Sequence, residues 1–207
     1  MMYSIAVITG DLVDSTQLGP RKVEQAMQAL RKCAESQADW MGADLLFTQH
    51  RGDGWQVVLL APKYGLRSAI LFRAVLRALG EEFDSYIGIA EGQIDRPPSA
   101  NLNTENNTVF VASGRALDLA KTASSHINHN RGGGHAATAI LLDRVCQEWT
   151  QTQAQDTVHA LLPDNAPNYT ELSALLGKSR QAVSKSLRSA WNDEIRKALN
   201  MLESQDG

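Results

Sequence analysis

The sequence is poor in cysteine, in long apolar runs and in export signals. Its 207 residues include two cysteines, Cys33 and Cys146, which are far apart and lack the spacing of metal ligands. We therefore expect two free thiols in a reducing compartment. No apolar run reaches the length of a membrane span, and the start, MMYSIAVITG, has no basic segment before its apolar residues. These absences predict a cytoplasmic protein without a membrane partner.

The chain also lacks an excess of positive charge. Its 20 lysines and arginines against 23 aspartates and glutamates give a net charge of -3, which argues against a protein that coats nucleic acid over its whole surface. A total charge says nothing about its distribution, however. The stretch 177–190 holds four basic residues and no acidic one: Lys178, Arg180, Lys185 and Arg188.

Hydrophobic periodicity predicts an α+β region followed by an all-helical region. A β-rich apolar run at 3–9 precedes a helical pattern from residue 20 to about residue 40. Two strand-like runs joined by Arg51-Gly52-Asp53-Gly54 come next, then a helical pattern at 64–79 and a fourth strand at 85–94. This βαββαβ order is the ferredoxin-like split pattern.

The ferredoxin-like order brings two acidic residues to the same edge of the sheet. A right-handed crossover leaves strands one and two parallel, with strand three between them. The end of strand one, at Asp11, then lies beside the start of strand three, at Asp53. Because Mg²⁺ takes one or two protein carboxylates, we interpret the pair as a site for Mg²⁺ or Mn²⁺. The alternative is that Asp53-Gly54 is only a hairpin turn.

Three polar residues between strand one and the first helix predict a phosphate contact next to this metal. Asp14, Ser15 and Thr16 lie where free backbone N–H groups and the positive end of a helix favour an anion. The alternative is that Asp14 or Ser15 caps the helix. For Asp14 capping is the better interpretation.

Three histidines lie beside a run of glycines, beyond the polar stretch 95–108 that follows the fourth strand. His126, His129 and His135 have no cysteine or acid among them, so zinc binding is not favoured. We interpret the segment with the histidines as a flexible polar linker, with Gly132-Gly133-Gly134 as a hinge. Every segment after this point reads as helical.

The motifs of the first two-thirds of the chain resemble a known family. VITGDLVDST, RGDGWQVVL and GIAEGQI are similar to the nucleotidyl cyclase fold of class III adenylate and guanylate cyclases. The chain looks closest to the SatD family, whose start, GD hairpin and GRAL-like helix match residues 10–15, 52–53 and 114–117. The resemblance implies that Asp11 and Asp53 hold metal, with a backbone carbonyl from Leu12.

One motif of the cyclases is missing. Class III cyclases carry an Asn and an Arg four residues apart on the helix after the fourth strand, and ASGRALDLAKTA has no such pair. Arg115, expected near the N-terminus of that helix, is a candidate phosphate or nucleotide contact. The alternative is a solvated arginine over an apolar stem. The resemblance thus implies nucleotide or metal binding, and the catalytic residues stay unknown.

The segment TELSALLGKSRQAVSKSLRSA has the pattern of a helix-turn-helix. Gly177 permits a tight turn and Ser179 can cap the second helix. The apolar positions of the two helices are expected to be buried: Leu172, Leu175, Leu176, Val183 and Leu187. A later helix, from about residue 191 to 202, is expected to pack on the pair through Trp191, Ile195, Leu199 and Leu202.

The outward face of the second helix carries side-chain types that contact bases and phosphates. The candidate DNA-binding residues are Ser179, Arg180, Gln181, Ser184, Lys185 and Arg188. The segment is similar to the helix-turn-helix of LuxR-type and sigma region-four modules, in which GxSxxxV begins the recognition helix. The alternative is a helical hairpin with a solvated basic face.

Together these patterns predict three segments: a nucleotidyl cyclase-like domain at 1–130, a linker with a connecting helix at 131–145, and a helix-turn-helix domain at 146–207. The leading hypothesis is a homodimeric, DNA-binding transcriptional regulator whose first domain senses a nucleotide with Mg²⁺. One rival is a metal-dependent nucleotidyl cyclase or a related phosphoryl-transfer enzyme. A third hypothesis is a scaffold that binds no nucleotide.

Overall fold

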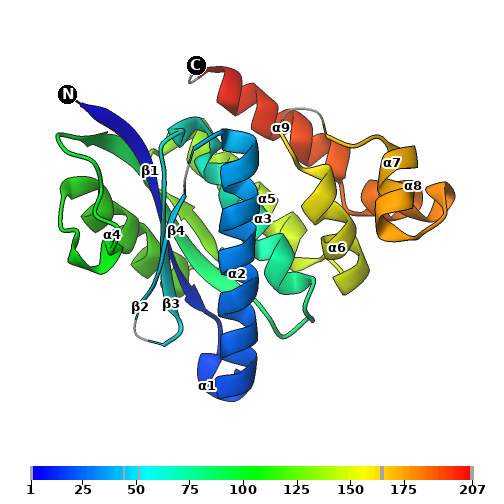
Figure 1. The fold of residues 1–207 in the computed structure, drawn as a ribbon, viewed down its shortest axis with the longest axis horizontal. Helices are drawn as coiled ribbons and strands as arrows, with labels where there is room; N and C mark the ends of the chain where they lie inside the picture. The colour runs from blue at the N-terminus through cyan, green and yellow to red at the C-terminus, as the bar shows by residue number, and fades with distance from the viewer. Residues whose placement is uncertain (1, 44, 51, 164–165, 206–207) are drawn as a thin grey trace.

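A computed structural model describes residues 2–43, 45–50, 52–163 and 166–205. The fold is α+β: a five-stranded mixed sheet with helices, followed by an all-helical region (Figure 1). The strands are β1 (Tyr3–Leu12), β2 (Leu46–His50), β3 (Gly54–Leu59), β4 (Ser85–Ile94) and β5 (Ile127–His129). The helices are α1 (Ser15–Leu18), α2 (Pro20–Met41), α3 (Gly65–Arg77), α4 (Thr108–Thr122), α5 (Gly133–Gln147), α6 (Gln151–Ala160), α7 (Tyr169–Leu176), α8 (Arg180–Ser189) and α9 (Asn192–Gln205).

The strand order confirms that β3 lies between β1 and β2, and it adds a fifth strand. The order is β2-β3-β1-β4-β5, and β3 is antiparallel to both β1 and β2. Strands β1 and β2 are therefore parallel with β3 between them. In the β1–β3 ladder Asp11 pairs with Gly54, so the end of β1 lies beside the start of β3. Arg51, the first residue predicted for the hairpin, lies outside the described residues.

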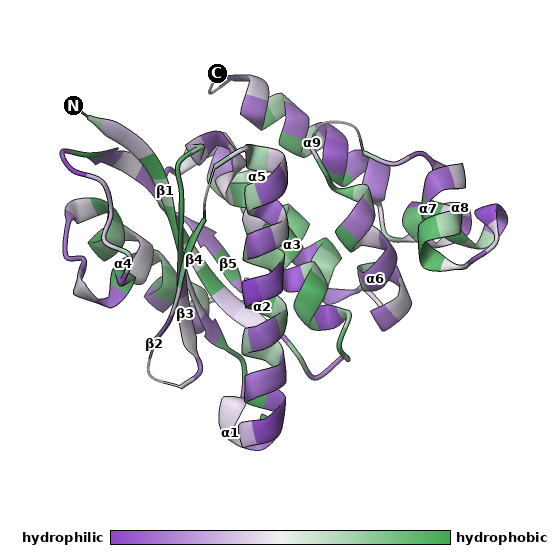
Figure 2. Cartoon of the chain, viewed as in Figure 1, coloured by the Kyte–Doolittle hydropathy of each residue, from purple (hydrophilic) through white to green (hydrophobic). Residues whose placement is uncertain are grey.

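Helices cover both faces of the sheet. Alternate residues of β1 enter different clusters, because successive side chains of a strand point to opposite faces. Ala6 and Ile8 pack with α2 and α3, whereas Ile5 and Val7 pack with α4. In Figure 1, α4 lies on one side of the sheet and α2 on the other. Figure 2 shows the strands as mostly hydrophobic and α2 with alternating polar turns, as expected for a helix with one buried face.

Helix α4 packs unusually close to strand β4 at Gly88. A Cβ placed on Gly88 would lie 2.2 Å from the backbone oxygen of Ser113 and 2.2 Å from the backbone nitrogen of Leu117. Only glycine therefore allows this approach. The contact fixes α4 across the same end of the sheet that carries Asp11.

The structure corrects the expectation of a flexible polar linker around the three histidines, which follow α4. Ile127–His129 forms β5, which extends the sheet parallel to β4. His129 is buried, and its Nε2 lies 3.1 Å from Oε1 of Glu91. Helix α5 starts at Gly133, where the hinge was expected, and buries Ala139 and Leu142. A strand of three residues with a histidine and an asparagine is too short and too polar for periodicity to reveal it.

Buried ion pairs connect the all-helical region to the sheet region. Arg67 of α3 is fully buried and donates to both carboxylate oxygens of Glu203 in α9, at 2.6 and 2.8 Å. It also donates to Asn200 and to the carbonyl oxygen of Leu161. Each donating nitrogen of the guanidinium group thus has a partner, which a buried arginine requires.

A second buried arginine joins three segments of the sheet region. Arg73 of α3 contacts Asp84, which precedes β4, and Asp143 of α5. Burial by itself raises the pKa of the Asp84 carboxyl, but Arg73 and His126 more than offset this effect and hold the pKa well below its usual range.

None of the described helices is both long enough and apolar enough to cross a membrane.

Cys33 and Cys146 are both free, as expected, and both are buried. Burial raises the pKa of the Cys33 thiol to about 12, although a hydrogen bond from Gln37 partly opposes this rise. Such a thiol stays protonated near neutral pH and is a poor nucleophile.

Candidate functional site

The two acids predicted to bind metal lie at adjacent backbone positions. The amide of Leu12 donates to the carbonyl oxygen of Asp53 at 3.2 Å, directly after the Asp11–Gly54 pair. This adjacency follows from the crossover that places β3 beside β1.

The carboxylate groups of these two acids nevertheless have partners on different faces of the sheet. Oδ2 of Asp11 lies 2.7 Å from Nζ of Lys121 in α4. Oδ2 of Asp53 accepts a hydrogen bond from the hydroxyl of Ser15 in α1. Asp11 and Asp53 also line different cavities. The sheet edge therefore brings the backbones together but not the two carboxylates.

This arrangement does not fit a Mg²⁺ or Mn²⁺ site shared by Asp11 and Asp53. Oδ2 of Asp11 is already neutralised by the ammonium group of Lys121. Within the described ranges no cluster of three or more His, Cys, Asp or Glu residues could hold a metal ion. Leu12, the third expected contributor, is buried. We therefore derive no chemical step through a metal.

The predicted phosphate residues lie at a helix of only four residues. Asp14 is at the N-cap position of α1 in a left-handed conformation, with φ of 49°, and its side chain makes no capping hydrogen bond. Its backbone carbonyl accepts from Gln17 and Leu18 instead. A helix of only four residues has a weak dipole, so its N-terminus carries less positive partial charge than the sequence analysis assumed for a phosphate contact.

Ser15, Thr16 and Asp53 do lie in one crevice, of about 720 Å³, between α2 and the β2–β3 hairpin. Its wall includes residues that the sequence reasoning missed, namely Val23, Met27, Gln28 and Arg31 of α2 and Gln49 of β2. The guanidinium of Arg31 lies over the ring of Phe47, 4.9 Å from its centroid. The helical spacing of these α2 residues was the available signal, but it did not show which face meets the hairpin.

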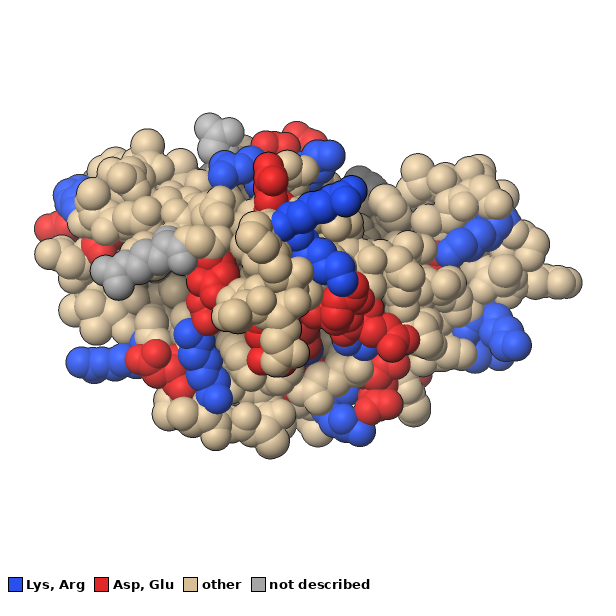
Figure 3. All heavy atoms as spheres, turned by 90° about the horizontal axis from the view of Figure 1, so that it is seen from below, with Lys and Arg blue, Asp and Glu red and all other residues tan. Residues whose placement is uncertain are grey.

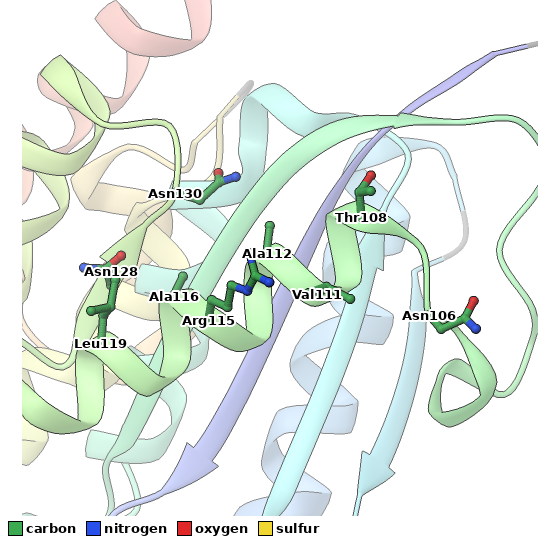
Figure 4. Close-up of a pocket in the computed structure, with 9 residues that line it drawn as sticks. All are labelled: Asn106, Thr108, Val111, Ala112, Arg115, Ala116, Leu119, Asn128 and Asn130. Carbon is green, nitrogen blue, oxygen red and sulfur yellow. The ribbon is translucent and has the colours of Figure 1, made fainter.

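The structure corrects the position of Arg115. This residue lies in the middle of α4, not near its N-terminus, because the helix already begins at Thr108. Its pocket is lined by neither Ser15, Thr16 nor Asp53. The predicted phosphate contacts are thus divided between two cavities. Figure 4 shows Arg115 at the centre of its own pocket, on α4.

The turn between α7 and α8 has the predicted geometry. Gly177 has φ of 62°, in the left-handed region where glycine is favoured. The Ser179 hydroxyl accepts from the amide of Ala182 at 3.1 Å and so caps α8. Val183 and Leu187 are buried against α6 and α7.

Two apolar residues expected in this core are exposed. Leu175 is 59% exposed, because the short α7 presents Leu172 and Leu176, one turn apart, to the core. Trp191 is 58% exposed with φ of 59°, which turns its side chain away at the junction of α8 and α9. The neighbouring Ala190 is buried in its place. Ile195 and Leu199 are buried and Leu202 partly so, as predicted.

The predicted DNA-binding residues of α8 line one hollow on the surface. They are Arg180, Gln181, Ser184, Lys185 and Arg188, with Ser189 beside them. In the described part of the chain, Arg180, Lys185 and Arg188 form no ion pair with an acid. Figure 3 shows basic side chains at the end of the molecule where α7 and α8 lie, while most acidic side chains lie over the middle of that face.

Lys178 differs from the other three basic residues of this stretch. Its ammonium group forms an ion pair with Asp156 of α6, which is fully buried. The other three basic residues form no ion pair with an acid of the described chain, so their charges are available to bind another molecule.

No family model matches this chain, and no curated protein matches it. The geometry of its own residues therefore carries the functional argument.

Proposed function

We propose that the chain is a DNA-binding transcriptional regulator that reads DNA with α8. One observation carries the proposal: the outward face of α8 gathers three cations and three hydrogen-bonding side chains in one hollow. Arginine and glutamine can hydrogen-bond to guanine and adenine, and lysine and serine can contact phosphates. The α7–turn–α8 geometry supports a helix-turn-helix of the LuxR or sigma region-four type, whose second helix enters the major groove.

The proposal includes a homodimer in the cytoplasm, since helix-turn-helix proteins usually read paired half-sites. For the sheet region we propose a ferredoxin-like, nucleotidyl cyclase-like domain of the SatD kind that acts as a sensor. The βαββαβ order and the Gly52-Asp53 turn beside the end of β1 support this assignment. The boundaries at 130 and 146 stay predictions.

Salt dependence of DNA binding tests the proposal. We expect the protein to bind a fluorescent duplex selected from upstream genomic DNA, with an affinity that falls as salt rises. Each phosphate contact contributes about 0.9 to the slope of log K against log salt. If Arg180 and Lys185 both contact phosphate, the double variant Arg180→Ala/Lys185→Ala should flatten this slope by about 1.8.

The matched control is Arg21→Ala/Lys32→Ala, which removes two exposed cations of α2. It should leave affinity and slope unchanged. Equal binding by the wild type and the α8 variant at modest salt would contradict the proposal.

A second candidate function is nucleotide binding in the crevice shared by Ser15, Thr16 and Asp53. We expect ATP or GTP to raise the unfolding temperature of the wild type and to raise that of Ser15→Ala/Thr16→Ala less. The variant Arg144→Gln is the control, because Arg144 is an exposed residue of α5 that does not line the crevice. Assays with and without MgCl₂ show whether a metal contributes.

The same nucleotides test the two remaining hypotheses. If the wild type converts ATP or GTP into a product and Asp53→Asn does not, the phosphoryl-transfer enzyme is favoured. The ion pair between Asp11 and Lys121 makes this alternative the weaker one. No shift with either nucleotide would contradict nucleotide binding and favour the scaffold.

A further inference from the structure

A pocket of about 400 Å³ lies between α4 and β5, and neither Asp11 nor Asp53 lines it. Small side chains create it: Ala112 and Ala116 lie one turn apart on α4 and leave a hollow. Val111 and Leu119 border the hollow and are 44% and 57% exposed. The volume lies in the range of small-molecule sites.

The polar groups of this pocket include several hydrogen-bond donors. In Figure 4, Arg115 lies at the centre, Asn128 and Asn130 lie at one end, and Asn106 lies at the other. Oδ1 of Asn130 accepts from the amide of Glu91, which leaves the NH₂ group of Asn130 free to donate. No partner is found for the guanidinium of Arg115 among the described residues.

The charge of the pocket distinguishes it from the other cavities of the sheet region. Arg115 is its single charged lining residue. The crevice at Asp53 also contains Glu24, against Arg31, and the cavity at Asp11 also contains Glu105, against Lys121. These two cavities therefore have a negative balance, whereas the α4–β5 pocket is positive.

No acid of the described residues forms an ion pair with Arg115. Asp118, three residues further along α4, forms no ion pair in the described chain. Glu91 of β4 contacts His129 and Arg131, at 3.1 and 3.3 Å.

We infer that the α4–β5 pocket binds a small organic anion: a carboxylate or a phosphate monoester on a compact, partly apolar body. The guanidinium of Arg115 presents two parallel N–H groups to the anion. The asparagine amides hydrogen-bond to polar groups of the ligand, and Val111 and Leu119 lose exposed apolar surface to its body. This inference does not depend on DNA binding by α8.

Three probes of similar shape test the inference on the full-length protein. Benzoate, phenyl phosphate and the neutral benzamide are titrated while backbone amide signals are followed by ¹H–¹⁵N NMR. We expect benzoate or phenyl phosphate to shift the amides of 111–119 and 127–130 in a saturable way. Benzamide should shift them at least ten-fold more weakly. Comparing the two anions shows which headgroup the pocket prefers.

Two variants remove different features of the pocket. Arg115→Gln removes the charge, and Ala112→Phe fills the hollow while keeping Arg115. Each should weaken anion binding at least ten-fold, whereas Arg144→Gln, at an exposed position of α5, should not. Unchanged thermal unfolding shows that the variants are folded.

Three outcomes would overturn the inference. They are shifts of the same size with benzamide, wild-type binding by Arg115→Gln, and anion-induced shifts that are absent from 111–130 or equally large at the basic face of α8. Since α8 is monitored in the same spectra, general anion binding to arginine is distinguished from binding in the pocket.

Discussion

At the scale of single residues, Lys178 shows that the environment of a basic side chain decides its role. The residue lies in the turn before α8, yet its ammonium group points inward to Asp156. Oδ2 of Asp156 is buried without a hydrogen-bond partner, so Lys178 is the main compensation for this buried charge. We infer that Lys178 orients α8 against α6 and does not contact DNA.

Removal of Lys178 should therefore destabilise the protein more than removal of an exposed lysine. Lys178→Met leaves a buried carboxylate without its counter-ion, which we expect to cost about 3 kcal/mol in the free energy of unfolding. Urea denaturation measures this cost. The double variant Lys178→Met/Asp156→Leu should recover most of it, because it replaces both charges by apolar groups.

The same double variant separates orientation from DNA contact. Its DNA affinity should show the wild-type salt slope, since no phosphate contact is lost. A slope flattened by about 0.9 would place Lys178 among the phosphate contacts. Additive losses of stability in the two single variants and their double would contradict the ion-pair argument.

At the scale of elements, the sequence was sufficient to predict the order βαββαβ and the meeting of β1 with β3. Both depend on period-two and helical patterns and on the handedness of crossovers, which are local or general rules. The direction of the Asp11 side chain was not predictable in this way. Its partner, Lys121, comes from a helix on the face opposite α2, and no local pattern encodes that contact.

The C-terminal helices show the same limit. The turn at Gly177 and the cap at Ser179 were predictable because each depends on residues within one turn of the helix. The exposure of Trp191 was not, because it follows from a left-handed backbone conformation at a non-glycine residue. The residues of each proposed ligand site come together only through tertiary packing. Arg31 reaches its crevice because α2 packs beside the β2–β3 hairpin, and Asn128 of β5 reaches its pocket because α4 packs on the sheet.

The contacts between α3, β4 and α5 make the stability of the protein sensitive to acid. Burial opposes the charge of Asp84, but Arg73 and His126 lower its pKa in the folded state. A lowered folded-state pKa stabilises the fold above the unfolded value, near 3.8, and this contribution is lost as the pH falls below it. The wild type should therefore lose more stability than Asp84→Asn between pH 6 and pH 3.

Urea denaturation at a series of pH values measures this difference. The control is Asp118→Asn, which changes an exposed acid without an ion pair among the described residues. It should follow the wild-type pH profile. Parallel profiles for the wild type and Asp84→Asn would contradict the prediction.

At the scale of the whole molecule, helices α6 and α9, against which α8 packs, share a core with the sheet region. Ala154 of α6 and Ile195 and Leu199 of α9 belong to the same apolar cluster as the residues of β1 and α3. The buried pair of Arg67 and Glu203 joins the two regions as well. A ligand that moves α3 would therefore also move α6 and α9, two of the helices against which α8 packs.

The Arg67–Glu203 pair also has a consequence for how such a protein can evolve. A module that recombination moves between genes has to fold wherever it arrives. Helix α9 would arrive with a buried carboxylate and two apolar side chains that lack their partners on α3 and in the sheet region. We expect this C-terminal region to be inherited together with its own sheet region and not to be exchanged alone.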